Sequence, residues 1–325
     1  MRIGVIGGGA WGTALAQTAA GGGDVLLWAR DADVVAVIDA AHENPAYLPG
    51  VALSPAIRAT ADIADLARCQ AILVVAPAQH VREVLGRLPA SGAPLILCAK
   101  GIEAGTKLLM TEVALEARPD APIAVLSGPS FAHEVAAGQP TALTLACEDI
   151  GLGEALAARL ARPAFRLYRS TDVVGAEIGG AVKNVLAIAC GVVEGMGLGQ
   201  NARAALISRG FAEMTRFGVA RGARLETLAG LSGLGDLVLT CSSSSSRNFS
   251  LGVGLGRGAS AADLLADRRT VAEGAFTAPV LRAAAVAARV EMPIVDAVCA
   301  LIEGEAAAND VVETLLARPR RSEGG

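Results

Sequence analysis

The pair Lys183-Asn184 is a candidate for chemistry because lysine is rare in this chain. Lysines and arginines together number 28, yet only Lys100, Lys107 and Lys183 are lysines. A chain that takes most of its positive charge from arginine tends to keep lysine where a compact amine must lose its proton, which a guanidinium does not do. We therefore predict that Lys183 is a general acid or base. On the count alone, a surface lysine without a role is an equal alternative.

A glycine-rich turn near the N-terminus predicts a second kind of site. Arg2–Ile6 is typical of a short buried strand, and Gly7-Gly8-Gly9-Ala10-Trp11-Gly12 leads from it into a helical segment. In such a turn the first glycine permits the sharp bend, the second lets the backbone approach a pyrophosphate, and the third allows close helix packing. With a second strand at Val25–Trp28, this context predicts dinucleotide binding.

The residues after the second strand bear on which dinucleotide binds. An NAD site usually offers a carboxylate there to the ribose 2′-hydroxyl, whereas an arginine can meet the 2′-phosphate of NADP. Here Arg30 comes first and Asp31 follows it. We therefore expect a modest preference for NADPH over NADH, with use of both as one alternative and a solvated loop arginine as the other.

The remaining apolar runs indicate an α/β sheet followed by helices. Runs at 71–75, 95–98 and 123–126 are separated by helix-length segments, as in a parallel sheet covered on both faces. Binding groups in such folds collect at the carboxyl ends of the strands, where Lys100 could meet a phosphate or a carbonyl. Beyond about Val174 the pattern changes to helices, with two expected at 181–193 and 204–219.

A serine run suggests an anion site in the helical part. Residues Ser242–Ser246 would alone be typical of a linker, which remains an alternative. They are followed at once by Arg247, Asn248 and an expected helix. Arginine can bind phosphate with two parallel hydrogen bonds, and both an amide and a helix N-terminus add donors. We predict that this loop binds an anion.

Composition excludes several classes of protein. The chain has 325 residues, a net charge of −4 and an isoelectric point near 5.5, which argues against nucleic acid as the main partner. No uninterrupted apolar run approaches the roughly 20 residues of a membrane span, and we expect a soluble cytoplasmic protein. The six cysteines lie far apart, without a Cys-x-x-Cys pair, so neither a disulfide framework nor a metal site is expected.

Taken together, the motifs closely resemble the bacterial-type NAD(P)-dependent glycerol-3-phosphate dehydrogenases from Ile3 to about Ile302. The segments that carry the resemblance are Gly7–Gly12, Asn44–Gly50, Lys100–Glu103, Ser127–Ala132, Gly180–Asn184, Asn201–Arg203, Gly235–Leu237 through Thr240-Cys241, Ser246–Asn248 and Val271–Gly274. Departures are small: Ala10 stands where members often have serine, and the serine run is unusually uniform.

The resemblance implies a Rossmann-like doubly wound α/β domain at 1–174 and an all-α substrate-binding domain at 175–325, with the site in the cleft between them. It implies reversible NAD(P)H-dependent reduction of dihydroxyacetone phosphate to sn-glycerol 3-phosphate, which feeds phospholipid synthesis, with Lys183 as proton donor and acceptor. The implied substrate contacts are Lys100, Gly128, Ser130, Lys183, Asn184, Asp236, Thr240, Ser246, Arg247 and Asn248. The implied cofactor contacts are Gly7, Gly9, Ala10, Trp11, Gly12, Arg30, Tyr47, Lys100, Ala132, Arg247, Val271 and Glu273.

Two other functions are also compatible with parts of this sequence. A β-hydroxyacid dehydrogenase would share the architecture and a catalytic lysine, but that family tends to place its asparagine one helical turn after the lysine, and Asn184 is adjacent to Lys183. A dinucleotide sensor would bind the cofactor without turnover. Apolar helical surface also suggests a homodimer, whose face the sequence does not locate.

Overall fold

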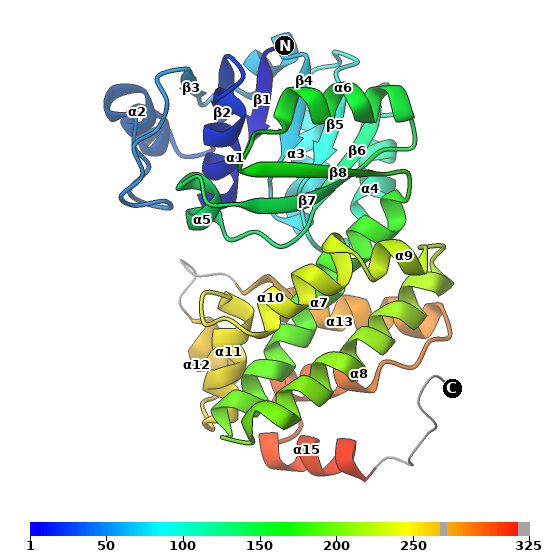
Figure 1. Cartoon of the computed structure of the whole chain (residues 1–325). Coiled ribbons are helices and arrows are strands. Elements are labelled where there is room, and N and C mark those ends of the chain that lie inside the picture. Colours follow the sequence, from blue (N-terminus) through cyan, green and yellow to red (C-terminus); the bar gives the residue numbers. More distant parts are fainter. Residues whose placement is uncertain (267–271, 318–325) are drawn as a thin grey trace. The chain divides into compact units, whose positions relative to one another are not determined.

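The computed structural model describes residues 1–266 and 272–317 (Figure 1). These residues form two compact units. The sheet unit comprises Met1–Gly180 and Gly222–Asp236, and the helical unit comprises Ala181–Arg221 and the described residues from Leu237 onward. The domain boundary that the sequence predicts, after Val174, lies six residues before Gly180, where the first segment of the sheet unit ends. The segment 222–236, which follows that boundary in the sequence, is also part of the sheet unit.

The sheet unit is built on eight strands in the described part of the chain. Their order across the sheet is β3-β2-β1-β4-β5-β6-β7-β8, and every neighbouring pair is parallel except β6 and β7. The first six strands therefore follow the doubly wound order of dinucleotide-binding sheets. The strands are β1 (Ile3–Ile6), β2 (Val25–Trp28), β3 (Ile57–Thr60), β4 (Ala71–Val74), β5 (Leu95–Leu97), β6 (Ile123–Ser127), β7 (Thr141–Ala146) and β8 (Phe165–Ser170).

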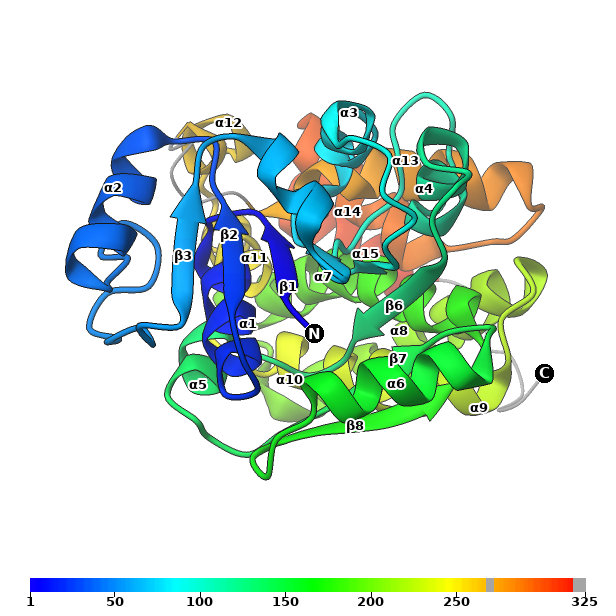
Figure 2. The ribbon, with the colours of Figure 1, turned by 90° about the horizontal axis from the view of Figure 1, so that it is seen from above.

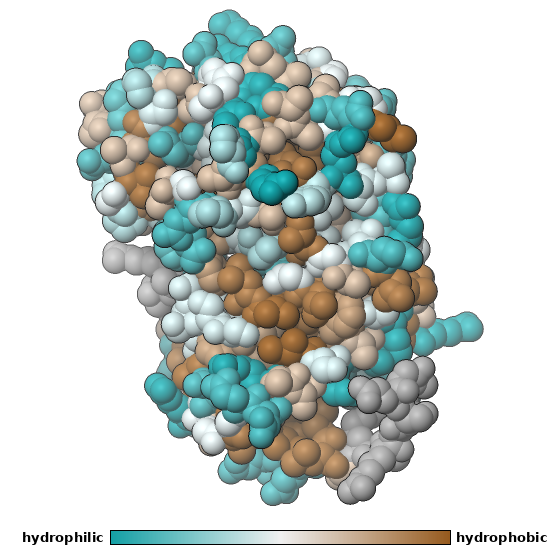
Figure 3. Space-filling view, viewed as in Figure 1, coloured by the Kyte–Doolittle hydropathy of each residue, from teal (hydrophilic) through white to brown (hydrophobic). Residues whose placement is uncertain are grey.

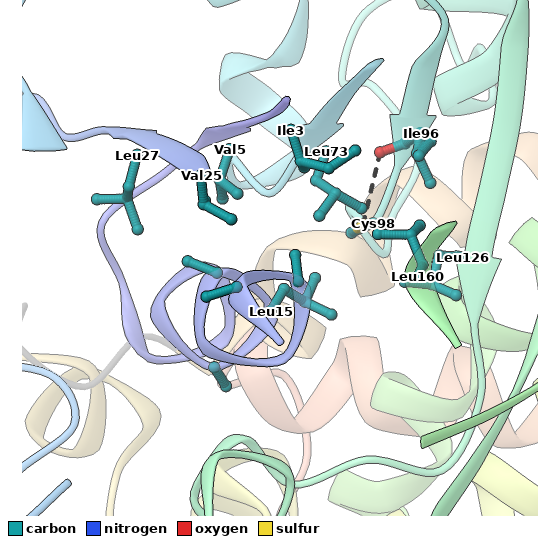
Figure 4. Packing of buried hydrophobic residues seen from close by; sticks show 14 of the residues in the cluster. Ile3, Val5, Leu15, Val25, Leu27, Leu73, Ile96, Cys98, Leu126 and Leu160 are labelled. Carbon is teal, nitrogen blue, oxygen red and sulfur yellow. Dashed lines mark hydrogen bonds between the residues drawn. The ribbon is translucent and has the colours of Figure 1, made fainter. Parts of the chain in front are cut away.

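Helices cover both faces of this sheet. Figure 2 shows α1 and α6 on one side, and α3 and α4 on the other. Successive residues of a strand point to opposite faces, so Val5 and Leu73 enter one core while Ile6 and Val74 enter the second. Figure 4 shows the first core, with Leu15 of α1 beneath the strands. The helices of this unit are α1 (Ala10–Ala20), α2 (Ala32–Ala41), α3 (Val81–Arg87), α4 (Met110–Ala117), α5 (Ala132–Ala136), α6 (Ile150–Leu160) and α9 (Leu225–Leu228).

The helical unit has helices throughout its described residues. Figure 3 shows apolar side chains gathered on one face of it, and its exposed large apolar residues include Leu198, Val219 and Val238. Two of its helices begin within the sheet unit, α7 (Val173–Gly195) and α10 (Asp236–Cys241). The others are α8 (Gly199–Ala220), α11 (Arg247–Gly256), α12 (Ala261–Leu265), α13 (Glu273–Ala287), α14 (Pro293–Glu303) and α15 (Ala308–Leu316).

Helix α7 is long and apolar enough to cross a membrane by length and composition. However, 94% of its most apolar window is buried in the protein, as is typical of a core helix. Four glycines let α7 and α11 touch backbone to backbone. A Cβ on Gly191 would lie 2.1 Å from Phe249 O, and one on Gly252 would lie 2.0 Å from Ile188 O. Gly195 and Gly256 repeat this contact one turn later, so alanine fits at none of these positions without moving a backbone.

The expected start of the core helix at Ala181 is wrong, because α7 begins eight residues earlier, at Val173. Gly175, Gly179 and Gly180 lower the helix propensity of this stretch. The helix forms nonetheless because Asp172 Oδ1 accepts the Gly175 N–H at 2.9 Å, which caps its first turn. The backbone at Ser232 also packs closely on Gly179, where a Cβ would lie 2.1 Å from the Ser232 carbonyl oxygen.

Candidate active site

The glycine turn after β1 has the geometry that a dinucleotide site needs. Gly7 has a φ of +120°, which disfavours any side chain, and a Cβ on Gly12 would lie 1.9 Å from Gly7 O. Gly9 differs from both, because its φ is −74° and nothing lies within 4 Å of where its Cβ would be. No side chain caps α1 at Gly9, so the first-turn N–H groups, at Ala10 and Trp11, can serve an anion.

Asn44 holds this turn in place, a role that the sequence did not predict. Its side-chain amide donates to Gly8 O at 2.9 Å and to Thr13 Oγ1 at 2.8 Å, and the residue is 1% exposed. Asn44 is the first residue of the segment 44–50, which carries part of the family resemblance, but that resemblance implies a role there only for Tyr47. Tyr47 itself is about half exposed.

The residues after β2 have separate tasks. Asp31 caps α2, because its Oδ1 accepts the Asp33 N–H at 2.9 Å, so one oxygen of the carboxylate is used by the helix. Arg30 is exposed and precedes this cap. Among the other predicted cofactor contacts, Ala132 begins α5 and Glu273 begins α13, whereas Val271 lies outside the described residues.

The sheet unit brings four of the predicted substrate contacts together. Lys100 Nζ lies 2.7 Å from Asp236 Oδ2, in an ion pair whose carboxylate is completely buried. The same amine donates to Gly128 O at 3.3 Å, and Ser130 Oγ donates to that carbonyl at 3.1 Å. A buried ion pair is tolerated when further hydrogen bonds satisfy its members. The arrangement therefore offers one cation held in a fixed place.

The loop that carries Lys100 is anchored on its far side. Arg82 donates two hydrogen bonds of 2.8 Å to the Glu103 carboxylate, and these bonds are the main cause of the lowered pKa of that carboxyl group. Gln79 Nε2 donates to Ile102 O at 2.8 Å. Two residues before Lys100, burial raises the pKa of the Cys98 thiol, which stays protonated and acts as packing.

Two more predicted residues meet in the helical unit. Lys183 Nζ donates to Thr240 Oγ1 at 2.9 Å, and the two residues are 7% and 4% exposed. The amine thus has a fixed direction within a mostly dry surrounding. Lys107, by contrast, is an exposed loop residue with a φ of 62°.

The two asparagines with predicted substrate roles lie near the start of α13. Asn248 Oδ1 accepts the Gly274 N–H at 2.8 Å, and a Cβ on Gly274 would lie 2.5 Å from Asn184 O. Ser246 caps α11 by accepting the Phe249 N–H at 3.2 Å, and the exposed Arg247 is the first residue of that helix. The end of the serine run is therefore an ordered helix cap in this unit.

A doubly wound sheet with a pyrophosphate-type glycine turn, followed by a helical unit with a buried amine, defines an NAD(P)-dependent oxidoreductase. Two family models match the chain. The model for the N-terminus of NAD-dependent glycerol-3-phosphate dehydrogenase matches residues 2–152, and the one for its C-terminus matches residues 172–313. The chain belongs to the NAD-dependent glycerol-3-phosphate dehydrogenase family, which confirms the resemblance.

Comparison with individual relatives supports the same family. The chain is 62% identical over 324 residues to glycerol-3-phosphate dehydrogenase [NAD(P)+] 1 of Sphingopyxis alaskensis, with 99% of this chain and 98% of the relative covered. It is 65% identical over 323 residues to glycerol-3-phosphate dehydrogenase [NAD(P)+] of Erythrobacter litoralis, with the same coverage. The crystal structure of glycerol-3-phosphate dehydrogenase from Coxiella burnetii is 38% identical, has a TM-score of 0.92, and covers 98% of this chain and 99% of its own.

Proposed function

We propose that this protein catalyses the reversible reduction of dihydroxyacetone phosphate to sn-glycerol 3-phosphate with NAD(P)H. The names of the relatives, which share about 60% of their residues with this chain, support glycerol 3-phosphate as the alcohol and NAD(P) as the cofactor, and dihydroxyacetone phosphate is the ketone that oxidation of this alcohol at C2 gives. The observation that carries the chemistry is the buried Lys183 amine, which donates to Thr240 Oγ1. Family membership favours this reaction over that of a β-hydroxyacid dehydrogenase, and the buried amine counts against a sensor without turnover.

In this proposal Lys183 Nζ gives its proton to the C2 oxygen as the carbonyl becomes an alcohol, and takes it back in the reverse direction. Thr240 keeps the amine pointing in one direction. Lys100, held by Asp236 and the Gly128 carbonyl, stabilises negative charge that develops on a substrate oxygen. A fixed amine and a fixed cation lower the barrier because neither has to reorganise during the reaction.

The phosphate group is assigned to the N-terminus of α11. Arg247 is the first residue of this helix and is exposed, so its guanidinium can bind phosphate with two hydrogen bonds. Asn248 uses its side-chain oxygen to accept the Gly274 N–H, which leaves its amide nitrogen to donate to the substrate. Ser246 fixes the turn from which both residues project.

The cofactor would be held by the glycine turn of the sheet unit. The open space at Gly9 and the uncapped N-terminus of α1 fit a pyrophosphate, and Arg30 fits a 2′-phosphate. When bound, the reduced nicotinamide supplies the hydride. Asn44 keeps the turn in shape for the pyrophosphate by its bonds to Gly8 O and Thr13 Oγ1.

We further propose that the enzyme works in the cytoplasm and supplies glycerol 3-phosphate for glycerophospholipid synthesis. The resemblance to the family supports both statements. The homodimer suggested by the sequence stays a prediction, which light scattering of the purified protein would test.

The first test is oxidation of NADPH and NADH with dihydroxyacetone phosphate, with dihydroxyacetone as the phosphate-free control. Turnover should require the phosphate.

The decisive variants are Lys183→Ala and Lys183→Arg, which should each lose about 10²-fold or more in kcat, since general acid catalysis typically contributes about 10² to 10⁴-fold. Lys107→Arg, at the exposed lysine, is the matched control and should behave as the wild type. Near-normal kcat in Lys183→Arg would remove Lys183 from the proton-transfer role.

A further inference from the structure

A buried hydroxyl at the end of β6 has no hydrogen-bond partner among the described residues. Ser127 is 3% exposed, and its Oγ neither donates nor accepts there. An unsatisfied buried hydroxyl costs roughly 1–3 kcal/mol, so proteins usually give such groups a partner. This cost is understandable if a ligand supplies the missing partner.

The surroundings of Ser127 indicate which ligand. A Cβ on Gly180 would lie 3.2 Å from Ser127 Oγ and 3.1 Å from Lys100 Cγ, so the hydroxyl and the lysine stem rest against the same bare stretch of α7. The next residue after Ser127 is Gly128, whose carbonyl accepts a hydrogen bond from Lys100 Nζ. All of these atoms belong to the sheet unit. The unpartnered hydroxyl therefore lies among the groups that hold the Lys100 amine.

The second serine of this loop shows the contrast. Ser130 Oγ already donates to Gly128 O at 3.1 Å, so its single donor is used inside the protein. Ser127 has both its donor and its acceptor capacity unused among the described residues. Of the two hydroxyls, that of Ser127 has the greater need for an external partner.

We propose that Ser127 is a further substrate-binding residue, whose Oγ donates a hydrogen bond to an oxygen of the phosphorylated three-carbon substrate beside Lys100. This inference rests on the proposed function. A hydroxyl suits both directions of the reaction, because it can donate to a carbonyl oxygen and can either donate to or accept from the alcohol that replaces it. Glycine at position 180 keeps the space next to this hydroxyl free of a side chain.

The test is Ser127→Ala, with steady-state kinetics and binding of glycerol 3-phosphate measured on the same preparations. We expect kcat/KM for dihydroxyacetone phosphate to fall by roughly 5- to 100-fold, the effect of one buried hydrogen bond. The thermal midpoint of the ligand-free protein should not fall, since the hydroxyl has no partner inside the described protein. The upward shift of that midpoint by glycerol 3-phosphate should shrink in the variant.

Two further variants separate hydrogen bonding from shape. Ser127→Cys keeps a side chain of similar form with a weak donor and should resemble Ser127→Ala. Thr215→Val removes another buried hydroxyl oxygen without a described partner, in α8 of the helical unit, and should leave the kinetics unchanged. Wild-type kcat/KM in Ser127→Cys would overturn the proposal, because packing alone would then explain the serine.

Different outcomes would refute the proposed function and the role of Ser127. If the wild-type protein does not reduce dihydroxyacetone phosphate with either cofactor, the proposed function is wrong. If the wild-type protein turns over and Ser127→Ala retains its kcat/KM and its stabilisation by glycerol 3-phosphate, the function stands and the role of Ser127 is refuted.

Discussion

The glycines of the β1–α1 turn and those of the α7–α11 contact serve different purposes. In the turn, Gly7 supplies a backbone conformation and Gly9 leaves open space on the side where a pyrophosphate would lie. In the helical unit, Gly191 and Gly252 lie inside regular helices and allow two backbones to meet. The first group is needed mainly for binding and the second mainly for folding. A glycine motif in a sequence therefore carries different meanings according to the element that contains it.

The largest effect is expected at the helix contact. In Gly252→Ala the new Cβ would lie 2.0 Å from Ile188 O and 2.9 Å from Gly191 Cα, and both atoms are backbone. Because a backbone cannot give way cheaply, we expect a loss of more than about 3 kcal/mol in the free energy of unfolding, or failure to fold. Urea titration followed by circular dichroism would measure it.

The control for this change is a helical glycine in open space. Gly86 in α3 is exposed and has nothing within 4 Å of its Cβ position, so Gly86→Ala should stabilise by about 0.4–1 kcal/mol. Wild-type stability in Gly252→Ala would show that the two helices are not in backbone contact, and would remove one half of the comparison.

A second prediction for the helical unit concerns a buried carboxylate, which makes the free energy of unfolding depend on pH. Glu213 of α8 is 2% exposed, and its Oε1 accepts the Ile294 N–H at 2.9 Å at the start of α14. Burial raises its pKa to about 7, against opposing hydrogen bonds from Ile294 and Val295; nearby Arg216 lowers the pKa and Asp296 raises it.

Because the pKa of Glu213 is raised in the folded protein, the stability of the protein falls as the pH rises. An unfolded glutamate has a pKa near 4.5, so between about pH 4.5 and 7 the folded protein holds the proton more tightly than the unfolded chain does. Stability from this group is complete below that window and is lost as the pH rises through it, by on the order of 3 kcal/mol. Glu213→Gln should flatten this dependence and be more stable than the wild type at pH 8.

Urea midpoints across this pH range would measure the effect, with Glu226→Gln at an exposed site of α9 as the control. An unchanged pH profile in Glu213→Gln would mean that the buried carboxylate does not govern the stability of the helical unit in this range.

The smallest effect on folding, with a clear effect on binding, is expected at Gly9. Its φ of −74° and its open surroundings accept alanine, and the entropy gained by removing a glycine opposes the poorer fit of alanine at the N-cap of α1, so Gly9→Ala should fold with little change in stability. The added methyl group would occupy the space predicted for the pyrophosphate, and we expect the dissociation constant of NADPH to rise on the order of tenfold or more. Titration calorimetry would measure it. Equal affinity for NADPH would contradict the assignment of the second glycine.

Much of the sheet is predictable because its central strands are fully buried. The apolar runs that became β1, β2, β4, β5 and β6 are confirmed within a residue or so at each end. Strands β3, β7 and β8 were not predicted from the sequence. Strand β3 has only four residues that alternate between buried and less buried positions, and most of β8 is partly or fully exposed. Such strands lack the continuous apolar run that marks a central strand.

The candidate site was only partly accessible to sequence reasoning. Its position after a predicted strand pointed to Lys100, and the family resemblance alone pointed to Asp236. Their ion pair joins residues 136 positions apart, which local patterns cannot predict. The brace formed by Asn44 and the unpartnered hydroxyl of Ser127 depend on which atoms meet after folding. Their roles, and those of the other predicted contacts, stay predictions until binding and kinetics are measured.

The scarcity of lysine has a practical consequence for labelling. Lys107 is the one exposed lysine, whereas the amines of Lys100 and Lys183 are hydrogen-bonded at mostly buried positions. An amine-reactive dye or coupling surface would therefore attach to side chains almost entirely at Lys107. Apart from the α-amine of the chain, the protein therefore offers one known point for tagging or immobilisation, and both lysines assigned to substrate remain unmodified.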